Sequence, residues 1–457
     1  MACVVTSLVA LASGAAAEEA AAAGAAASTG EATGFAFGSY GRVVASSNAE
    51  GGTGKRTSVV AHPARLDETT YLELDLGYRL HTDAWGDFRV VNTVAVTDAL
   101  FHLDGDFDGA LALRNSFVEA SGFGVERLTL WAGSRMLRGD DIYLLDFWPL
   151  DNLNTVGGGG RYDFAAGTRV GLHLGVNQLR DPYQYQEVEV AAPDFGTETV
   201  VLMDRARVIG SARVEQPLEL GRLGAKVVVY GEAHRLGEGV FEDAEQVRQT
   251  APAETGYTAG AQLGAWGWGD RGFANLFVRH STGIAAYGEL SVPRGVALDR
   301  TVEEAGLTRV ATSFGYGVGR FDLVGGGYLD WFHDADGVNY DIDDYYEGSV
   351  ALRGSVKVAG PLRQAVEVSY QGRRPDGLNK RTGTFVTPAI LKFAFMPTLS
   401  AGDGTLSRPE LRLIYQLSLL NRGARTQYPD DDVRSGESVQ HYVGIGAEWW
   451  FNSSTYQ

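Results

Sequence analysis

Residues 439–451 constrain the fold more than any other part of this chain, because they alternate strictly between two kinds of side chain. Val443 and Ile445 belong to an apolar set, whereas Gln440 and Glu448 belong to a small or polar set. Successive side chains of a β-strand point to opposite faces, so the segment predicts a strand with one apolar and one polar face. A two-faced strand with aromatic residues at its end, near a chain terminus, is typical of the strand that closes an outer-membrane β-barrel.

The same alternation recurs from residue 34 onward and is clearest in residues 69–82, where large apolar side chains alternate with polar ones. About nineteen such segments are present, and an even number of about 16 to 18 strands suits one bacterial barrel of this length. We therefore expect an all-β fold, a transmembrane antiparallel β-barrel of about 18 strands. The candidate segments are 34–46, 69–82, 88–97, 111–122, 126–136, 155–165, 168–178, 197–204, 205–215, 224–235, 256–267, 271–280, 308–318, 321–332, 347–358, 362–372, 384–398, 408–419 and 438–451.

Two kinds of connection separate these segments. Short turns such as Gly319–Arg320 alternate with long polar stretches. This alternation is typical of the periplasmic and extracellular ends of a barrel. The long stretches are 47–68, 139–154, 180–196, 236–255, 283–306, 333–346 and 421–437.

Composition excludes several other classes of protein. The net charge of −18 disfavours a nucleic-acid partner, which requires basic patches. Apart from the N-terminal segment, no run of about 18 apolar residues is present, which disfavours a helical membrane protein. A soluble β-sandwich or lectin also has short alternating strands, but the number of strands and the lack of a second domain favour the barrel. Its apolar faces would contact outer-membrane lipid.

The N-terminal residues have a different character. Residues 1–17 combine an apolar core with small residues and predict a signal peptide, although a short Ala-rich helix is the alternative. Residues 18–33 predict an Ala-rich linker, and residues 34–457 predict the barrel domain. Cys3 is the only cysteine, so no disulfide forms within the chain.

Aromatic and charged side chains share the polar faces of several predicted strands. Tyr40 and Arg42 form one such pair, and Tyr71 and Glu73 form another. Sugar rings have apolar C–H faces that stack on aromatic planes and hydroxyl groups that hydrogen bond to charged groups, so the combination suits a carbohydrate. Alternatively, the charges solvate a pore and the aromatics belong to the interfacial girdles. Further inward residues of this kind are Phe273, Asn275, Arg279 and Trp450.

Three segments resemble the maltoporin-like carbohydrate porins. Residues 130–151 resemble the family signature in which Trp-Ala-Gly-x-Arg leads into a constriction loop that ends in Asp-Phe-aromatic. Residues 65–74 resemble its Arg-Leu-Gly…Glu-Thr-Tyr-x-Glu-Leu segment, and residues 401–412 resemble its late Ala-Gly-Asp…Ser-Arg-Pro strand. The matches extend from about residue 34 to the C-terminal strand.

The resemblance implies a homotrimer of barrels in the bacterial outer membrane, each with a channel narrowed by an inward-folded loop. It implies facilitated diffusion of maltodextrin-like sugars along an aromatic slide and an ionic track, without a cofactor or catalytic residues. The slide residues that it implies are Tyr40, Tyr71, Phe273 and Trp450. The track residues are Arg42, Arg65, Glu73, Arg114, Asp141 and Asp146, and Trp148 stands where the family has a constriction tyrosine.

Several positions depart from the family pattern. Leu406 replaces a slide tryptophan, and Gly139 replaces a polar residue of the constriction loop. The first loop lacks the family's disulfide, and the aromatic that a neighbouring subunit would lend has Phe107 as its candidate match. A general diffusion or anion porin without a sugar site is therefore the main alternative, and a barrel enzyme is a second.

Acidic loops are the remaining candidates for chemistry. Oxygen-rich loops can bind Ca²⁺, although solvated acidic loops are commoner, and we predict no metal site. The acidic residues concerned are Asp334, Asp336, Asp341, Asp343, Asp344, Asp430, Asp431 and Asp432.

Overall fold

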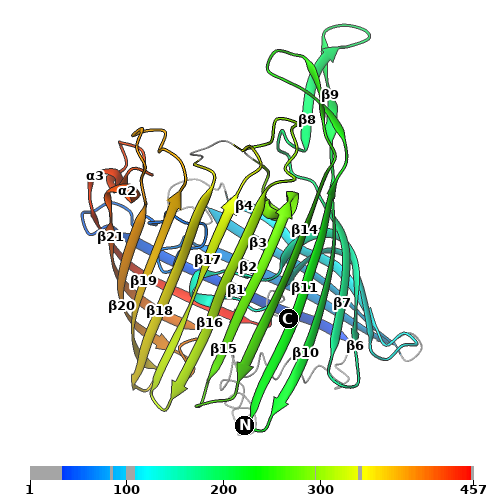
Figure 1. Cartoon of the computed structure of the whole chain (residues 1–457). Helices are drawn as coiled ribbons and strands as arrows, with labels where there is room; N and C mark the ends of the chain where they lie inside the picture. The colour runs from blue at the N-terminus through cyan, green and yellow to red at the C-terminus, as the bar shows by residue number, and fades with distance from the viewer. Residues whose placement is uncertain (1–32, 83–85, 99–108, 294, 338–341, 454–457) are drawn as a thin grey trace.

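The closed barrel is the main feature of the computed structural model, which describes residues 33–82, 86–98, 109–293, 295–337 and 342–453 (Figure 1). Eighteen strands form one antiparallel sheet. The last strand, β22 (Val439–Phe451), pairs with the first, β1 (Gly34–Ser47), so the sheet has no free edge. The predicted fold is confirmed. The predicted signal peptide and nearly all of the predicted linker lie outside the described residues.

The other barrel strands follow one another around the ring in chain order. They are β2 (Tyr71–Thr82), β3 (Gly86–Asp98), β4 (Gly109–Ser121), β5 (Leu128–Arg138), β6 (Asn152–Asp163), β7 (Arg169–Asn177), β10 (Arg207–Leu220), β11 (Leu223–Leu236), β14 (Glu254–Trp266), β15 (Phe273–Gly283), β16 (Gly306–Val318), β17 (Phe321–His333), β18 (Tyr345–Ala359), β19 (Leu362–Pro375), β20 (Ala389–Ser400) and β21 (Glu410–Leu420). Short helices η2 (Tyr143–Leu145), η3 (Ile284–Tyr287), α2 (Arg422–Arg425) and α3 (Val433–Gly436) lie in the connections. Within the described residues, no helix is long and apolar enough to cross a membrane.

One predicted segment is not a barrel strand. Residues 197–204 form β9 (Thr197–Asp204), which pairs with β8 (Tyr185–Ala191) in a separate hairpin. This hairpin rises above the barrel at the end that carries the long loops (Figure 1). A second hairpin, β12 (Gly239–Glu242) and β13 (Arg248–Ala251), was not predicted. Alternation alone does not distinguish a barrel strand from a strand of a hairpin outside the barrel, because every extended strand turns successive side chains to opposite faces.

Long and short connections alternate as predicted. The hairpins and helices α2 and α3 lie at one end of the barrel, and the short turns lie at the other (Figure 1). Residues 401–409 are longer than the other connections at the short-turn end. Part of this segment is buried, since Thr405 is only 6% exposed.

The two faces of the strands differ in exposure as the alternation predicts. On β22, Ile445 is 62% exposed on the outer wall, whereas Glu448 is fully buried on the inner wall. On β1, Phe35 is exposed on the outside, and Tyr40 and Arg42 are buried inside. Side chains that face the lumen are buried because loops fold into it.

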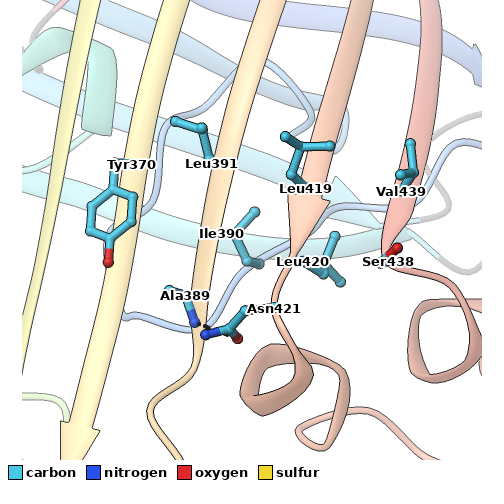
Figure 2. Close-up of a pocket in the computed structure, with 9 residues that line it drawn as sticks. All are labelled: Tyr370, Ala389, Ile390, Leu391, Leu419, Leu420, Asn421, Ser438 and Val439. Carbon is cyan, nitrogen blue, oxygen red and sulfur yellow. Dashed lines mark hydrogen bonds between the residues drawn. The ribbon is translucent and has the colours of Figure 1, made fainter.

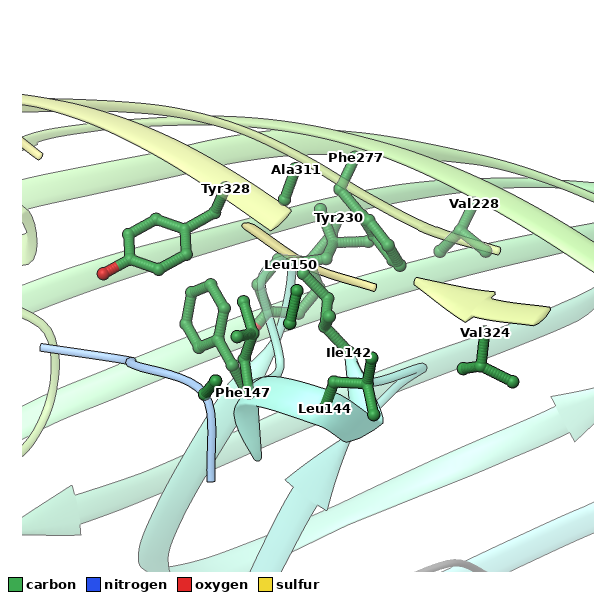
Figure 3. Packing of buried hydrophobic residues seen from close by; sticks show 13 residues of the cluster. Ile142, Leu144, Phe147, Leu150, Val228, Tyr230, Phe277, Ala311, Val324 and Tyr328 are labelled. Carbon is green, nitrogen blue, oxygen red and sulfur yellow. The ribbon is translucent and has the colours of Figure 1, made fainter. Parts of the chain in front are cut away.

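The loop between β5 and β6, residues 139–151, crosses the lumen and packs on the opposite wall. Its residues Ile142 and Leu150 join one apolar cluster with Val228 and Phe277 of that wall (Figure 3). All four side chains are at most 1% exposed. Apolar side chains on an inner wall would otherwise face water, so this burial holds the loop across the channel.

The loop between β1 and β2 fills another part of the lumen. Leu66 packs against inward residues of β19 to β22, including Ala394 and Ile414. The carboxylate of Asp67 accepts hydrogen bonds from Lys392 Nζ at 2.7 Å and from Gln416 Nε2 at 2.9 Å. Two inward loops therefore narrow the barrel from different sides.

Candidate functional site

A cavity of about 250 Å³ lies where the two inward loops approach β1 and β2. Seven of the predicted site residues line it together: Tyr40, Arg42, Tyr71, Glu73, Arg114, Asp146 and Trp148. The remaining lining residues are His62, Arg138, Phe147 and Asn152.

Two tyrosine rings form the aromatic part of this cavity. The ring centroids of Tyr40 and Tyr71 are 5.9 Å apart, on adjacent strands β1 and β2. The guanidinium carbons of Arg42 and Arg114 lie 5.6 and 5.7 Å from the centroid of the Tyr71 ring. Cations at this distance are attracted by the ring quadrupole, which holds Tyr71 in place. The Arg114 guanidinium and the Tyr71 hydroxyl both contact the buried carboxylate of Glu73.

Charges of both signs border these rings. Arg42 pairs with Glu68 at 2.8 Å and lies 3.5 Å from Asp146. Asp146 ends helix η2 with a φ of 50°, a left-handed conformation, at a turn of the constriction loop. Burial alone would raise the pKa of Asp146, but the cations Arg65 and Arg42 hold that pKa below its ordinary value. Asp146 is therefore ionised at neutral pH.

Two stacked rings, of His62 and Phe147, also line the cavity. The His62 ring stacks on Phe147 with centroids 3.9 Å apart, and the Arg309 guanidinium lies 4.5 Å from the Phe147 ring. Burial and the nearby charge of Arg309 lower the pKa of His62 to about 3, so this imidazole is neutral.

Trp148 is covered by a cation from the neighbouring strand. The Arg138 guanidinium carbon lies 3.8 Å from the Trp148 ring centroid, and Arg138 Nε donates to Asn152 at 2.6 Å. The cavity therefore contains a cation, Arg138, directly next to Gly139 in the sequence. A Cβ atom on Gly139 would come within 2.5 Å of Arg213 Nη1, which pairs with Asp151. A side chain at this position would collide with that ion pair.

Next to the cavity-lining Tyr40, the carboxylate of Glu448 binds three cations. It accepts hydrogen bonds from Arg65 at 2.8 Å, from Arg408 at 2.7 Å and from Arg412 at 3.1 Å. Tyr143 also donates to it, at 2.7 Å. These residues come from the first loop, the turn 401–409, β21 and the constriction loop. The network therefore fixes both inward loops to the wall.

The sequence profile of the LamB porin family matches residues 35–451. The chain belongs to the LamB porin family. It is an outer-membrane porin, a channel protein of the bacterial outer membrane. The comparison with curated protein sequences gives no match.

Solved outer-membrane structures also resemble this LamB porin. OccD3 (OpdP) of Pseudomonas aeruginosa shares 11% identity with a TM-score of 0.44, over 92% of this chain and 91% of that one. OmpT of Vibrio cholerae, in its trimer form, shares 12% with a TM-score of 0.43, over 92% and 100%. The channel DcaP of Acinetobacter baumannii shares 12% with a TM-score of 0.44, over 92% and 98%.

The other predicted site residues of this LamB porin lie around the cavity or away from it. Trp450 is opposite Tyr40 in the β1–β22 register, and Arg408 lies 4.6 Å from its ring. The Arg65 guanidinium contacts the hydroxyl of Tyr40. The structure does not bring Phe273 to this group, because Phe273 starts β15 on the opposite wall and lies against Gly315.

Asp141 and Leu406 are not among the residues that line the cavity. Asp141 lies half-buried at the start of the constriction loop. Burial and the neighbouring carboxylates Asp146 and Asp140 raise its pKa to about 7. Leu406 packs against the apolar cluster under the constriction loop. Phe107 lies outside the described residues.

Sequence reasoning did not assign roles to Tyr143, His62 or Glu448. Glu448 was on the predicted inner face, and Tyr143 was inside the motif segment, so a signal existed for both. His62 lies in a loop without periodicity and offered no signal. Among the described residues, no group of three or more His, Cys, Asp or Glu side chains could hold a metal ion.

Proposed function

We propose that this LamB porin is selective for carbohydrates and passes maltodextrin-like oligosaccharides by facilitated diffusion. The supporting observation is the juxtaposition of the Tyr40 and Tyr71 rings with Arg42, Arg114 and Glu73 in one lumen cavity. Aromatic faces suit the C–H faces of sugar rings, and the flanking ions suit hydroxyl groups.

The proposed path continues beyond the cavity. Tyr71, Tyr40 and Trp450 lie on three adjacent strands, β2, β1 and β22, and Tyr40 is opposite Trp450 in the register. A sugar could pass from ring to ring while it exchanges hydrogen bonds with the ions beside them. Several weak contacts suit transport, because a substrate must leave as readily as it enters.

Sugar-dependent block of single-channel current tests the proposal. The double variant Tyr71→Ala/Trp450→Ala should raise the half-blocking concentration of maltooligosaccharides about tenfold or more. Ion conductance should stay equal or increase, because two large side chains leave the lumen. Tyr78→Ala is the matched control, since Tyr78 lies on the same strand but faces outward and is 40% exposed. Unaltered block in the double variant would refute the proposed path.

A general diffusion or anion porin is the second candidate. Three guanidinium groups, of Arg42, Arg114 and Arg138, line the cavity with two carboxylates, of Glu73 and Asp146. Such a porin would conduct small ions without saturable block by any sugar. A panel of mono- and oligosaccharides in the same recordings distinguishes the two functions.

We also propose that the porin is a homotrimer, as the family resemblance implies. Light scattering coupled to size-exclusion chromatography in a mild detergent measures the protein mass. A mass of one chain would refute this assembly.

A further inference from the structure

A groove of about 340 Å³ lies on the outer wall, near the long-loop ends of β19 to β22 (Figure 2). Its volume is at the lower end of the range of about 300–1,000 Å³ found for ligand pockets. Three of its apolar side chains are exposed on the outside of the barrel, Tyr370 at 50% and Leu419 and Val439 at 36% each. The other lining residues are Ala389, Ile390, Leu391, Leu420, Asn421 and Ser438.

The groove adjoins two small residues on neighbouring strands. Ala389 of β20 is opposite Gly372 of β19 in the register. Leu391, two residues further along β20, lies between Tyr370 and Leu419 (Figure 2). Ile390 and Leu420 also line the groove, but they alternate with Leu391 and Leu419 and turn toward the lumen, where they are 0% and 3% exposed. There Ala424 packs against them in a separate apolar cluster. The wall behind the groove is therefore supported from the inside.

Hydrogen bonds also fix the end of the groove that lies next to the long loops. The side chain of Asn421 accepts from the Ala389 backbone N–H at 3.0 Å and donates to the Thr387 carbonyl at 2.8 Å. The backbone N–H of Arg373 donates to the Pro388 carbonyl at 3.0 Å. These bonds fix the ends of β19 and β21 on either side of residues 387–388.

Two exposed cations flank this end. Arg374 lies on β19, four residues beyond Tyr370 on the same outward face, and Arg422 follows Asn421 directly. Within the part of the chain that the structure describes, neither guanidinium forms an ion pair or a side-chain hydrogen bond. Glu437 adjoins the opposite rim, beside Ser438. The two guanidiniums are therefore available to an anion at this end of the groove.

We propose that this groove binds an acyl chain of a phosphorylated membrane lipid, whose phosphate pairs with Arg374 and Arg422. The groove is continuous with the apolar wall that an outer-membrane porin presents to lipid. An acyl chain matches its apolar lining, and a phosphate matches guanidinium groups, which bind its oxygens with paired N–H donors. This inference does not depend on sugar selectivity.

Native mass spectrometry of the intact porin in a non-ionic detergent tests the site. The probes are bisphosphorylated lipid A and the same lipid with its phosphates removed. The variant Arg374→Gln/Arg422→Gln should bind lipid A about tenfold more weakly and bind the dephosphorylated lipid as the unaltered porin does. Ala389→Phe fills the groove and should lose both lipids.

Arg235→Gln is the matched control. Arg235 is the next-to-last residue of β11, as Arg374 is of β19, and is likewise exposed on the outward face, but it adjoins none of the groove residues. Its variant should bind both lipids normally. Equal binding of the two lipids by the unaltered porin, or normal lipid A binding by the double variant, would overturn the proposal. A change in the number of chains in Ala389→Phe, with lipid binding intact, would instead assign the groove to a second copy and overturn it too.

Discussion

The hydroxyl group of Tyr143 donates a hydrogen bond to Oε2 of Glu448 across 2.7 Å, which joins the constriction loop to the last strand of the barrel. The same oxygen accepts from Arg408 in the turn at the opposite end of the barrel. The loop from one side of the membrane and the turn from the other thus meet at one carboxylate. The width of the channel depends on this network as well as on the loop itself.

Loss of the charge on Glu448 should destabilise the barrel more than loss of the Tyr143 hydroxyl. Glu448→Gln removes the carboxylate charge that Arg65, Arg408 and Arg412 share. Breaking a buried ion pair typically costs about 3–5 kcal/mol in the free energy of unfolding, although Arg408 and Arg412 keep Glu410 as a second partner. Tyr143→Phe removes the hydroxyl that donates to Glu448 and accepts from Arg408. Because both partners keep other ion pairs, the loss should cost about 1.5–3 kcal/mol. Urea unfolding in detergent, followed by tryptophan fluorescence, measures both. Glu437→Gln, on an exposed loop, should be neutral, and a Glu448→Gln variant as stable as this control would contradict the network's role.

Truncation of the wall under the constriction loop should loosen the loop. Phe277 is fully buried in the cluster that holds residues 139–151, so Phe277→Ala should cost about 3–5 kcal/mol and increase both conductance and current noise. Single-channel recording measures the second effect. Val278→Ala is the control, since Val278 is the next residue on the strand and faces outward at 46% exposure. Equal conductance traces for the two variants would show that the loop is anchored elsewhere.

The barrel and the faces of its strands were predictable because they depend on local alternation. Tyr40, Arg42, Tyr71 and Glu73 all lie on the predicted inner faces. The same rule failed for residues 197–204, since a hairpin outside the barrel is also extended.

The filling of the lumen could not be read from alternation. Asp67 is fixed by Lys392, which is 325 positions away in the sequence. His62 meets Phe147 from a different loop. Such contacts depend on how the loops fold into the closed barrel, and no periodic pattern within a loop encodes them. For Phe273, alternation predicted correctly that the side chain faces inward. It did not predict that this residue lies on the wall opposite the cavity.

Neutralisation of Arg114 should shift ion selectivity toward cations. Arg114 contacts Glu73 in the cavity, so Arg114→Gln removes one positive charge beside this carboxylate. The local potential then becomes more negative and attracts cations. The reversal potential in a KCl gradient measures the change. Arg320→Gln, in an exposed short turn, removes the same charge away from the cavity and should leave the reversal potential unaltered. A shift of equal size in both variants would indicate that only net charge matters.

Channel selectivity should also depend on pH near neutrality. Burial and the nearby carboxylate of Asp146 raise the pKa of Asp141 to about 7. Asp141 is therefore protonated below pH 7 and ionised above it, so cation preference should increase as the pH rises from about 6 to about 8.

The raised pKa of Asp141 also makes the free energy of unfolding depend on pH. The pKa of Asp141 in the folded protein lies above the ordinary value of 3.8, so between these values the folded protein holds a proton that the unfolded chain releases. The contribution of Asp141 to the free energy of unfolding therefore decreases as the pH rises through this window and is constant above about 7. Asp141→Asn should flatten both the selectivity profile and this decrease.

Glu289, in the loop between β15 and β16, provides the comparison that separates Asp141 from other titrating groups. Burial raises the pKa of Glu289 to about 7 as well, yet Glu289 lies outside the constriction loop that carries Asp141. Glu289→Gln should alter the pH dependence of stability in the same direction, because its folded pKa is also raised. It should leave the pH dependence of the reversal potential in place. If Glu289→Gln abolished that dependence and Asp141→Asn preserved it, the titrating group that controls selectivity would lie in the outer loops rather than at the constriction.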